Sequence, residues 1–212
     1  PDPVALEEFA ASADVHLVLM RLPKALQGLD DHARRLAALA HATGREDLTV
    51  IAGARVKHMT RTQNEVLAAS FTEVRASRGI GKSRALIAST PRPDAPAPAP
   101  ATGIARLQVR GGEREFSLRG IGSVFSGGRG DAGSLLLLEA LDRSATAGEV
   151  TAERVIDLGC GNGLMTAYLA AAFPEASVLG SDDEADAVAS TRATLEASAL
   201  ARPEVTVAWD SS

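Results

Sequence analysis

The stretch Val155-Ile156-Asp157-Leu158-Gly159-Cys160-Gly161-Asn162-Gly163 decides the fold, because a short apolar run in it ends in alternating glycines. The apolar residues predict a strand that is buried on both faces. The helix formers from Leu164 to Phe173 predict a helix directly after the glycines. Alternate glycines permit positive φ angles and a close approach of the backbone, while the first helical turn presents unpaired N–H groups. The stretch therefore predicts a ligand site on bare backbone.

The spacing of the glycines indicates which ligand the site takes. A dinucleotide fingerprint would place its third glycine at position 164, which is Leu, or at 166, which is Thr. Here the glycines follow Asp157 as G-x-G-x-G, a pattern that resembles motif I of the class I S-adenosylmethionine (SAM) methyltransferases. The next predicted strand, 177–181, ends on Asp182 and Asp183. A carboxylate there can accept hydrogen bonds from a ribose diol, so we assign this role to Asp182, with Asp183 as an alternative. An ordinary strand–helix turn with surface acids behind it is the competing interpretation.

Length and composition limit the class of protein. The 212 residues suggest one large or two small domains, and 45% hydrophobic residues are enough for a packed core. No apolar run is long enough for a membrane span, and the first residues do not form a secretory signal. The single cysteine, Cys160, cannot form an internal disulfide, which fits the cytoplasm. Its small size explains its place among the glycines better than nucleophilic chemistry does. The four histidines have no metal-ligand spacing, so we expect no metal site.

Charge is distributed unevenly along the chain. Residues 1–90 contain 12 basic and 10 acidic side chains, whereas residues 91–212 contain 10 basic and 17 acidic ones. The basic excess lies between Arg55 and Arg84, where phosphates are one possible partner and a solvated surface is an equally good explanation. The candidates for contact with RNA are Arg55, Lys57, Arg61, Arg78, Lys82 and Arg84.

The first half of the chain alternates predicted strands and helices. We expect strands at 15–20 and 48–53, a helix that starts near Pro23 and ends at Gly44, and a second helix at 62–70. Strands are then expected at 71–77 and 84–89. The segment 76–83 between them satisfies a relaxed phosphate-loop pattern, but the residues after Ser83 suit a strand instead of the long helix that such a loop needs. We therefore predict a hairpin turn with a basic tip.

Proline at nearly every second position of 91–100 predicts an extended spacer between two domains. A hairpin at 104–118, a glycine-rich turn and a helix at 134–141 then precede the glycine strand. A third strand is expected at 205–209, with Asp210 after it. The predicted domains are 1–90 and 103–212, with a linker at 91–102.

Several segments together resemble the bacterial ribosomal RNA guanine-N2 methyltransferases of the methyltransferase small domain type. They are Val124-Phe125-Ser126 with Asp131-x-Gly133, the glycine stretch, Ala187 to Arg192, and, in the first half, Leu19 to Lys24 and Val50 to Arg55. The resemblance implies two methyltransferase-like, doubly wound (Rossmann-like) α/β domains in tandem, the first without a cofactor site of its own and helping to hold RNA. Both domains are expected to be incomplete, as the back half of one and the front half of the other.

The resemblance also implies the cofactor, the partner and the site residues. SAM would be the cofactor, the partner would be rRNA or a ribosomal particle, and the protein would be a cytoplasmic monomer. The cofactor-binding residues would be Asp157, Gly159, Cys160, Gly161, Asn162, Gly163, Asp182, Asp183 and Asp210, with Phe125, Asp131 and Gly133 closing the pocket.

The catalytic residues of this family belong to an Asn-Pro-Pro-aromatic motif, and neither Asn-Pro-Pro nor Asp-Pro-Pro occurs in the 212 residues. We therefore expect no catalytic residue in this chain and no methyl transfer by it alone. The alternatives are a small-molecule SAM-dependent methyltransferase and a non-catalytic RNA- or ribosome-binding module whose glycine loop is empty.

Overall fold

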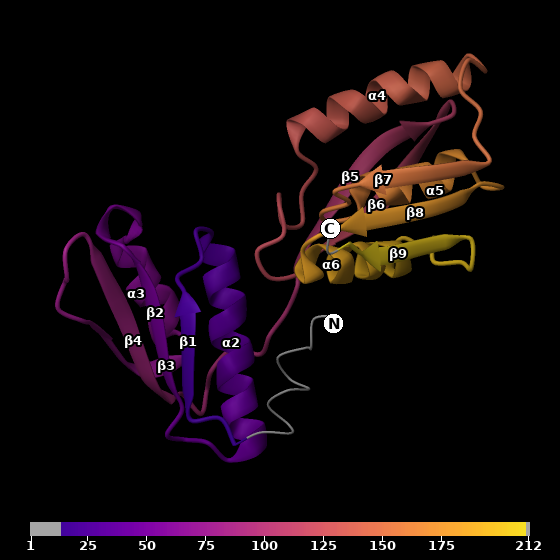
Figure 1. Ribbon diagram of the computed structural model, residues 1–212. Coiled ribbons are helices and arrows are strands. Elements are labelled where there is room, and N and C mark those ends of the chain that lie inside the picture. Colours follow the sequence, from indigo (N-terminus) through magenta and orange to yellow (C-terminus); the bar gives the residue numbers. More distant parts are fainter. Residues whose placement is uncertain (1–13, 211–212) are drawn as a thin grey trace. The chain divides into compact units, whose positions relative to one another are not determined.

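The computed structural model describes residues 14–210, which fall into two compact units that meet between Ala99 and Pro100 (Figure 1). The first 13 residues of the predicted first domain and the last two of the second lie outside the described residues. Within the described part of the chain, no helix is both long and apolar enough to cross a membrane. Each unit combines helices with a sheet, and we describe each by itself.

Unit 1 contains a mixed four-stranded sheet in the order β1-β2-β4-β3. Its elements are β1 (Leu17–Arg21), α2 (Leu26–Thr43), β2 (Thr49–Arg55), the 3₁₀ helix η1 (Val56–His58), α3 (Arg61–Ala68), β3 (Phe71–Ala76) and β4 (Ser83–Pro91). Strands β1 and β2 are parallel, and β4 is antiparallel to both β2 and β3. Helix α2 ends at Gly44, whose φ of 68° lets its N–H cap the last turn, as the sequence predicts.

The core of unit 1 lies on one face of this sheet. Leu29 and Leu36 of α2 and Leu67 of α3 pack with Val50 of β2 and Leu86 of β4. The phosphate-loop interpretation of 76–83 is excluded as predicted, because Ser83 begins β4 and pairs with Ile80 across a tight turn. Residues 92–100 contain neither helix nor strand. Strand β4 ends at Pro91, a strand end where a proline is tolerated, and the next strand begins at Ala101.

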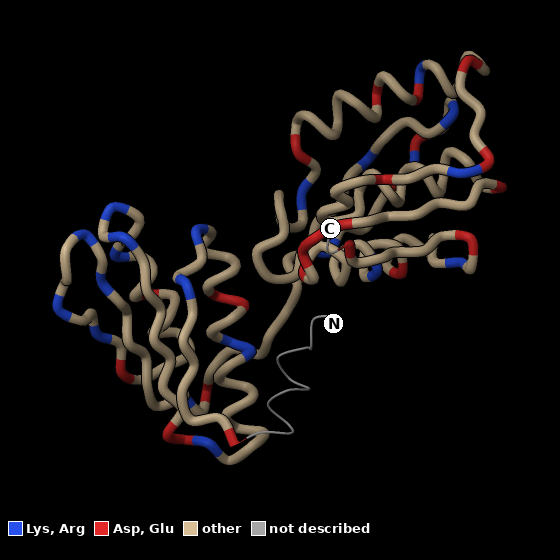
Figure 2. The backbone as a smooth tube through the Cα atoms, in the orientation of Figure 1, with Lys and Arg blue, Asp and Glu red and all other residues tan. Residues whose placement is uncertain are grey.

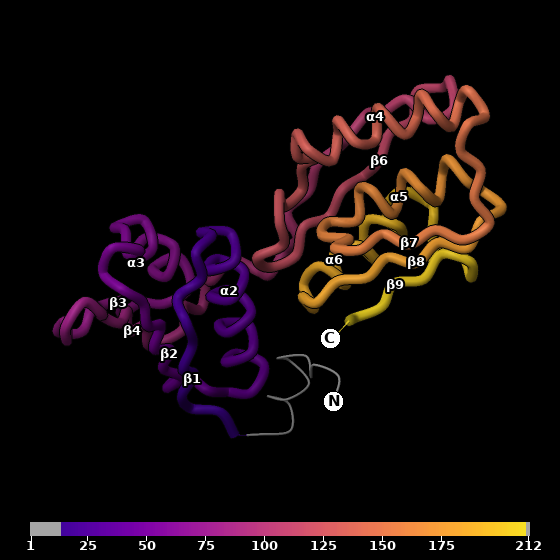
Figure 3. Tube along the Cα trace, turned by 45° about the horizontal axis from the view of Figure 1, so that its top comes forward, coloured from indigo at the N-terminus to yellow at the C-terminus, as the bar shows by residue number. Residues whose placement is uncertain are grey.

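Unit 2 contains a two-stranded hairpin and a parallel three-stranded sheet in the order β7-β8-β9 (Figures 1 and 3). Its elements are β5 (Ala101–Val109), β6 (Gly112–Gly120), α4 (Ala132–Thr146), β7 (Arg154–Leu158), α5 (Leu164–Ala172), β8 (Ser177–Asp182), α6 (Ala185–Ala197) and β9 (Val205–Trp209). Phe116 of the hairpin, Tyr168 of α5, Val178 of β8 and Leu195 of α6 share one core. Helices α5 and α6 therefore pack on the sheet on one side and on the hairpin on the other.

The prediction that the glycine strand is buried on both faces is wrong. Ile156 is 61% exposed and Leu158 is 78% exposed, whereas Asp157 between them is buried. Successive side chains of a strand point to opposite faces, and α5 and α6 cover the same face of the sheet. Helix α4 packs on α5 and the hairpin instead of on the sheet. The opposite face of the sheet is open in the part of the chain that the structure describes.

The free edge of β6 is covered by hydroxyl groups of α6. Backbone N–H groups of Ser117, Arg119 and Ile121 donate to the hydroxyls of Ser198, Thr194 and Ser190 at 3.0, 2.9 and 2.9 Å. Two strand residues advance by about 6.7 Å and four helical residues by about 6 Å, so a hydroxyl at every fourth helical position meets every second N–H of the strand. We call Ser190, Thr194 and Ser198 the hydroxyl ladder. It fixes the hairpin against α6.

The glycine-rich loop between β6 and α4 contacts the hairpin backbone to backbone. A methyl group at Gly103 would overlap the carbonyl oxygen of Gly128, and one at Gly120 would overlap the backbone of Gly127. Glycine is required on both sides of this contact because no Cβ fits. The loop is thereby held beside the first turn of α5.

Candidate functional site

The glycine loop after β7 has the backbone geometry that its sequence predicts. Gly159, Gly161 and Gly163 have φ angles of 78°, 54° and 82°, all in the left-handed region that glycine tolerates. A Cβ at Gly159 would meet nothing within 4 Å, and one at Gly161 would meet only the Gly159 carbonyl oxygen at 3.9 Å. A Cβ at Gly163 would lie 2.7 Å from Cα of Thr191 on α6. The first two glycines thus face open space, whereas the third is required by helix packing.

Asp182 at the end of β8 faces this loop. Its Oδ2 accepts the N–H of Gly161 at 3.0 Å, and its Oδ1 accepts the N–H of Glu184 at 3.0 Å. The N–H of Asp210 donates to the carbonyl oxygen of Asp182 at 2.9 Å. The carboxyl ends of β7, β8 and β9 are thereby joined around the glycines.

A hollow of about 220 Å³ lies at these strand ends, lined by Leu158, Gly159, Ser181, Asp182, Asp183 and Asp210. Three of the six lining residues are aspartates, and Figure 2 shows acidic positions at the ends of β8 and β9. Open parallel sheets bind ligands at this end of their strands. The hollow suits a ligand with hydroxyl donors or positive charge, because carboxylates accept hydrogen bonds and attract cations.

Asp157 does not line the hollow. Its side chain is 3% exposed and accepts a hydrogen bond of 2.5 Å from the hydroxyl of Thr166 on α5. Burial raises the pKa of this carboxyl above its ordinary value, and the Thr166 hydrogen bond opposes the rise. The residue connects β7 to the helix that follows the loop.

Cys160 and Asn162 both point into the protein. Burial raises the pKa of the Cys160 thiol to about 11, so it is a neutral thiol at pH 7, and its Sγ lies 3.2 Å from the hydroxyl oxygen of Thr191. The amide of Asn162 donates to the carbonyl oxygens of Gly127 and Arg129 at 2.9 and 2.7 Å. Asn162 therefore connects the glycine loop after β7 to the glycine-rich loop between β6 and α4.

Helix α6 fixes the glycine loop through two hydroxyls that the sequence analysis missed. Thr191 donates to the carbonyl oxygen of Gly161 at 3.1 Å, and Thr194 donates to that of Asn162 at 2.7 Å. Both threonines are fully buried. The available signal was the spacing of Ser and Thr by four positions in a helix, from residue 190 to residue 198.

Of the residues expected to close the pocket, Phe125 and Asp131 lie on the loop before α4 and Gly133 lies in its first turn, and none of them lines the hollow. Asp131 caps α4, because its Oδ1 accepts the N–H groups of Gly133 and Ser134 at 3.0 and 3.1 Å. The hydrogen bonds from Ser134 and Gly133 lower the pKa of Asp131. Phe125 is 73% exposed.

In unit 1 the structure brings three of the six RNA-contact candidates together. Arg55, Arg78 and Arg84 line one hollow, together with Arg21, which the sequence analysis did not select. Lys57 belongs to η1, Arg61 begins α3, and Lys82 lies in the turn before β4, all outside that lining. Among the described residues, no three His, Cys, Asp or Glu side chains are grouped as metal ligands.

Comparison with known proteins assigns a family to each unit. Residues 4–93 match the RLMG N-terminal domain, and residues 115–211 match the methyltransferase small domain. The chain is 34% identical over 191 residues to the ribosomal RNA large subunit methyltransferase G of Streptomyces avermitilis, which covers 87% of this chain and 47% of that protein. It is 32% identical to the protein of the same description from Ectopseudomonas mendocina, over 91% of this chain and 48% of that one.

A solved structure shows the same likeness. The T. thermophilus 16S rRNA N2 G1207 methyltransferase RsmC, in complex with AdoMet and guanosine, aligns with a TM-score of 0.67 and 26% identity over 96% of this chain and 52% of that chain. The fold is thus a mixed α/β, methyltransferase-like fold. The chain spans about half the length of the curated relatives it matches. Its two halves belong to two domain families, the RLMG N-terminal domain at residues 4–93 and the methyltransferase small domain at residues 115–211.

Proposed function

We propose that this chain carries the SAM-binding part of a ribosomal RNA guanine-N2 methyltransferase. The observation that carries the proposal is the contact of Asp182 with the N–H of Gly161, beside backbone at Gly159 and Gly161 that has open space in front of it. The family membership and the RsmC structure with AdoMet support the same assignment.

The residues of the hollow fit such a cofactor. Open space in front of Gly159 and Gly161 admits the methionine part, and Asp182 accepts from the ribose hydroxyls, with Asp183 beside it in the lining. Asp210 follows β9, where its carboxylate is placed to accept from the adenine amine. When bound, SAM supplies the methyl group and the positive charge of its sulfonium, which the three aspartates of the hollow attract. Asn162, Thr191 and Thr194 act indirectly, because they fix the loop that forms the floor.

The proposal extends to the organisation of the whole chain. We propose two doubly wound domains in tandem, with the first at 1–90, the linker at 91–102 and the SAM-binding domain at 103–212. An rRNA or ribosomal particle is the proposed partner and the cytoplasm the proposed location. Extrusion of the target guanine to the carboxyl ends of these strands, beside the bound SAM, would align its amine with the methyl group, and most of the rate would come from this alignment.

Calorimetric titration of the chain with SAM tests the proposal. We expect saturable binding, and Asp182→Ala should weaken it by about 10- to 100-fold, because hydrogen bonds to a charged acceptor are lost. Glu184→Ala is the matched control, since it removes a neighbouring carboxylate that does not line the hollow. Absence of SAM binding by the wild-type chain, or equal affinity of the Asp182 variant, would contradict the proposal and favour a binding module with an empty glycine loop.

A further inference from the structure

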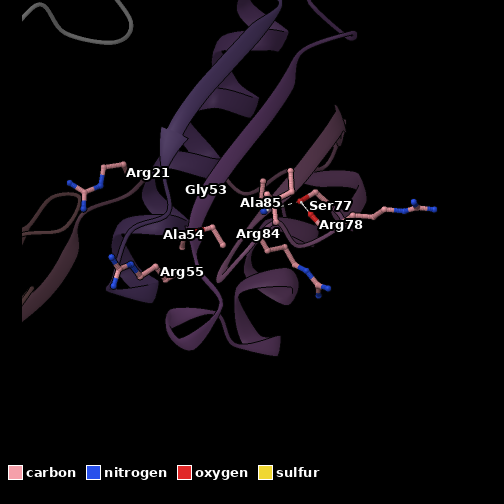
Figure 4. Close-up of a pocket in the computed structure, with 10 residues that line it drawn as sticks. Arg21, Gly53, Ala54, Arg55, Ser77, Arg78, Arg84 and Ala85 are labelled. Atoms are coloured by element: carbon pink, nitrogen blue, oxygen red, sulfur yellow. Dashed lines mark hydrogen bonds between the residues drawn. The ribbon is translucent and has the colours of Figure 1, made fainter.

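A hollow of unit 1 lies where its parallel strands end. Its volume is about 500 Å³, and its lining is Arg21, Gly53, Ala54, Arg55, Ser77, Arg78, Ile80, Ser83, Arg84 and Ala85 (Figure 4). Arg21 is the last residue of β1, and Gly53 to Arg55 end β2. The hollow is thus at the carboxyl ends of parallel strands, the position at which α/β sheets bind ligands.

The charge of this hollow is opposite to that of the aspartate-lined hollow in unit 2. Four of its ten lining residues are arginines, and none is acidic. Within residues 14–210, none of these four guanidinium groups forms an ion pair with a carboxylate. Arginine stays charged at all physiological pH values and binds phosphate oxygens well. The ligand of the hollow is therefore an anion, and phosphate is the anion that suits the guanidinium groups.

The floor of the hollow is made of small residues. Strand pairing places Gly53 between Arg21 and Ala85 in one row across the sheet. A Cβ added at Gly53 would meet no atom within 4 Å. A ligand can consequently lie directly on the backbone of β2 between the arginines.

The arginines surround this floor without converging on one point. Figure 4 shows the Arg21 and Arg55 side chains on one side of the Gly53–Ala54 strand and those of Arg78 and Arg84 on the other. A single phosphate ion cannot contact groups that are spread in this way, whereas a strand with several phosphates can. Ile80, which is 85% exposed at the turn before β4, adds apolar surface on which an unpaired base can rest.

We infer that this hollow binds an unpaired RNA strand, with phosphodiester groups on Arg21, Arg55 and Arg84 and the strand lying over Gly53. The inference rests on the proposed function, since an rRNA substrate supplies the strand. The proposed RNA contact includes Arg21 and Gly53, which were not among the candidates selected from the sequence. It does not include the candidates Lys57, Arg61 and Lys82, which lie outside the lining.

Fluorescence anisotropy of a labelled short oligouridine with the full chain tests the inference. Gly53→Leu should weaken binding by at least about tenfold although every charge is retained, because the side chain fills open space above the floor. Arg55→Gln should weaken binding and lower the slope of log affinity against log salt by about 0.7 for each lost phosphate contact. Arg75→Gln is the charge-matched control, because Arg75 is exposed on β3 outside the lining.

Three results would overturn the inference. Equal affinities of the Gly53→Leu and wild-type chains would show that RNA binds diffusely or elsewhere, as would equal losses from Arg55→Gln and Arg75→Gln. Saturable binding of inorganic phosphate alone, abolished by Gly53→Leu, would show a small-anion site instead of a strand site. Thermal denaturation of each variant checks folding, and SAM titration of the same samples separates failure of this inference from failure of the proposed function.

Discussion

Asp157 and Asp182 show how one functional group takes two roles in adjacent strands. The carboxylate of Asp157 is sealed between β7 and α5, where its partner is the Thr166 hydroxyl. That of Asp182 lines the hollow and bonds to the loop backbone. Both residues stand near strand ends, but strand alternation and the neighbouring helix decide which one is accessible. Of the two, only Asp182 lines the hollow.

The buried Asp157 predicts a pH dependence of stability. Burial raises its folded-state pKa above the unfolded value, so the folded chain binds the proton more tightly and the free energy of unfolding falls as pH rises through this window. Asp157→Asn removes that loss and keeps an acceptor for Thr166. We therefore expect the stability of the variant relative to the wild type to increase from acidic to neutral pH. Urea denaturation at both pH values measures it, and a pH-independent difference would contradict the assignment.

Substitution of Gly161 tests whether SAM binds in the open space in front of the glycine loop. Gly161→Val places a side chain in the open space in front of the loop and forces a β-branched residue to a φ of 54°. We expect loss of SAM binding in calorimetry and a stability cost of ~1–3 kcal/mol.

Gly148→Val is the matched control for Gly161→Val. It imposes the same kind of strain at a φ of 75° in a position with nothing within 4 Å, outside the hollow. It should lower the melting temperature and leave SAM affinity unchanged. If both variants bind SAM normally, the loop does not hold the cofactor.

At the scale of elements, α6 links two segments that are distant in the sequence, β6 and the glycine loop. Its hydroxyl ladder bonds to β6, and Thr191 and Thr194 bond to the glycine loop. Thr194 does both, since it accepts from the N–H of Arg119 and donates to the carbonyl oxygen of Asn162. The helix thus sets the position of the loop relative to the hairpin.

Thr194→Val tests this link. The substitution keeps the shape and leaves one buried N–H and one buried carbonyl without their partner, at a cost of about 2 kcal/mol. We expect weaker SAM binding as well as a lower melting temperature, with both restored in Thr194→Ser. Ser198→Ala, which removes a contact to β6 only, should lower stability without changing SAM affinity. Equal SAM affinity of Thr194→Val and the wild type would limit the ladder to a structural role.

Most elements were predictable because the sequence marks their ends. Gly44 ends α2, Pro174 follows α5, and alternate glycines separate β7 from α5. The open face of β7 was not predictable, because an apolar run shows that residues avoid water but not which element covers them. The roles of Asn162 and Thr194 were missed for a related reason, since their partners lie 33 to 35 and 32 residues away in the chain. Asp131 was assigned to the pocket, whereas the structure shows it as the N-cap of α4, for which Asp-x-Gly-Ser was a readable signal.

At the scale of the whole molecule, the two units place hollows of opposite charge at equivalent ends of their parallel strands. The uneven charge along the sequence therefore corresponds to two separate binding chemistries. Under the two proposals, one would attract a cationic, hydroxyl-bearing cofactor and the other would attract phosphates.

We predict that the 212-residue chain binds SAM but does not catalyse methyl transfer. It contains no Asn-Pro-Pro or Asp-Pro-Pro sequence to accept the protons of a guanine amine. We expect SAM binding but no transfer of labelled methyl from SAM to deproteinised rRNA or to ribosomal subunits. A full-length family member is the positive control. Incorporation of label by the chain alone would show that other residues perform the proton transfer.

The hydroxyl ladder also has a consequence for how copies of this chain behave in concentrated solution. An exposed edge strand has unpaired backbone N–H and C=O groups with which a strand of another molecule can pair, and ordered aggregates begin in this way. Along β6 the amide hydrogens that would recruit such a chain are already committed to Ser190, Thr194 and Ser198. A helix that fixes the glycine loop thus also protects the β6 edge of the neighbouring hairpin from adding further strands.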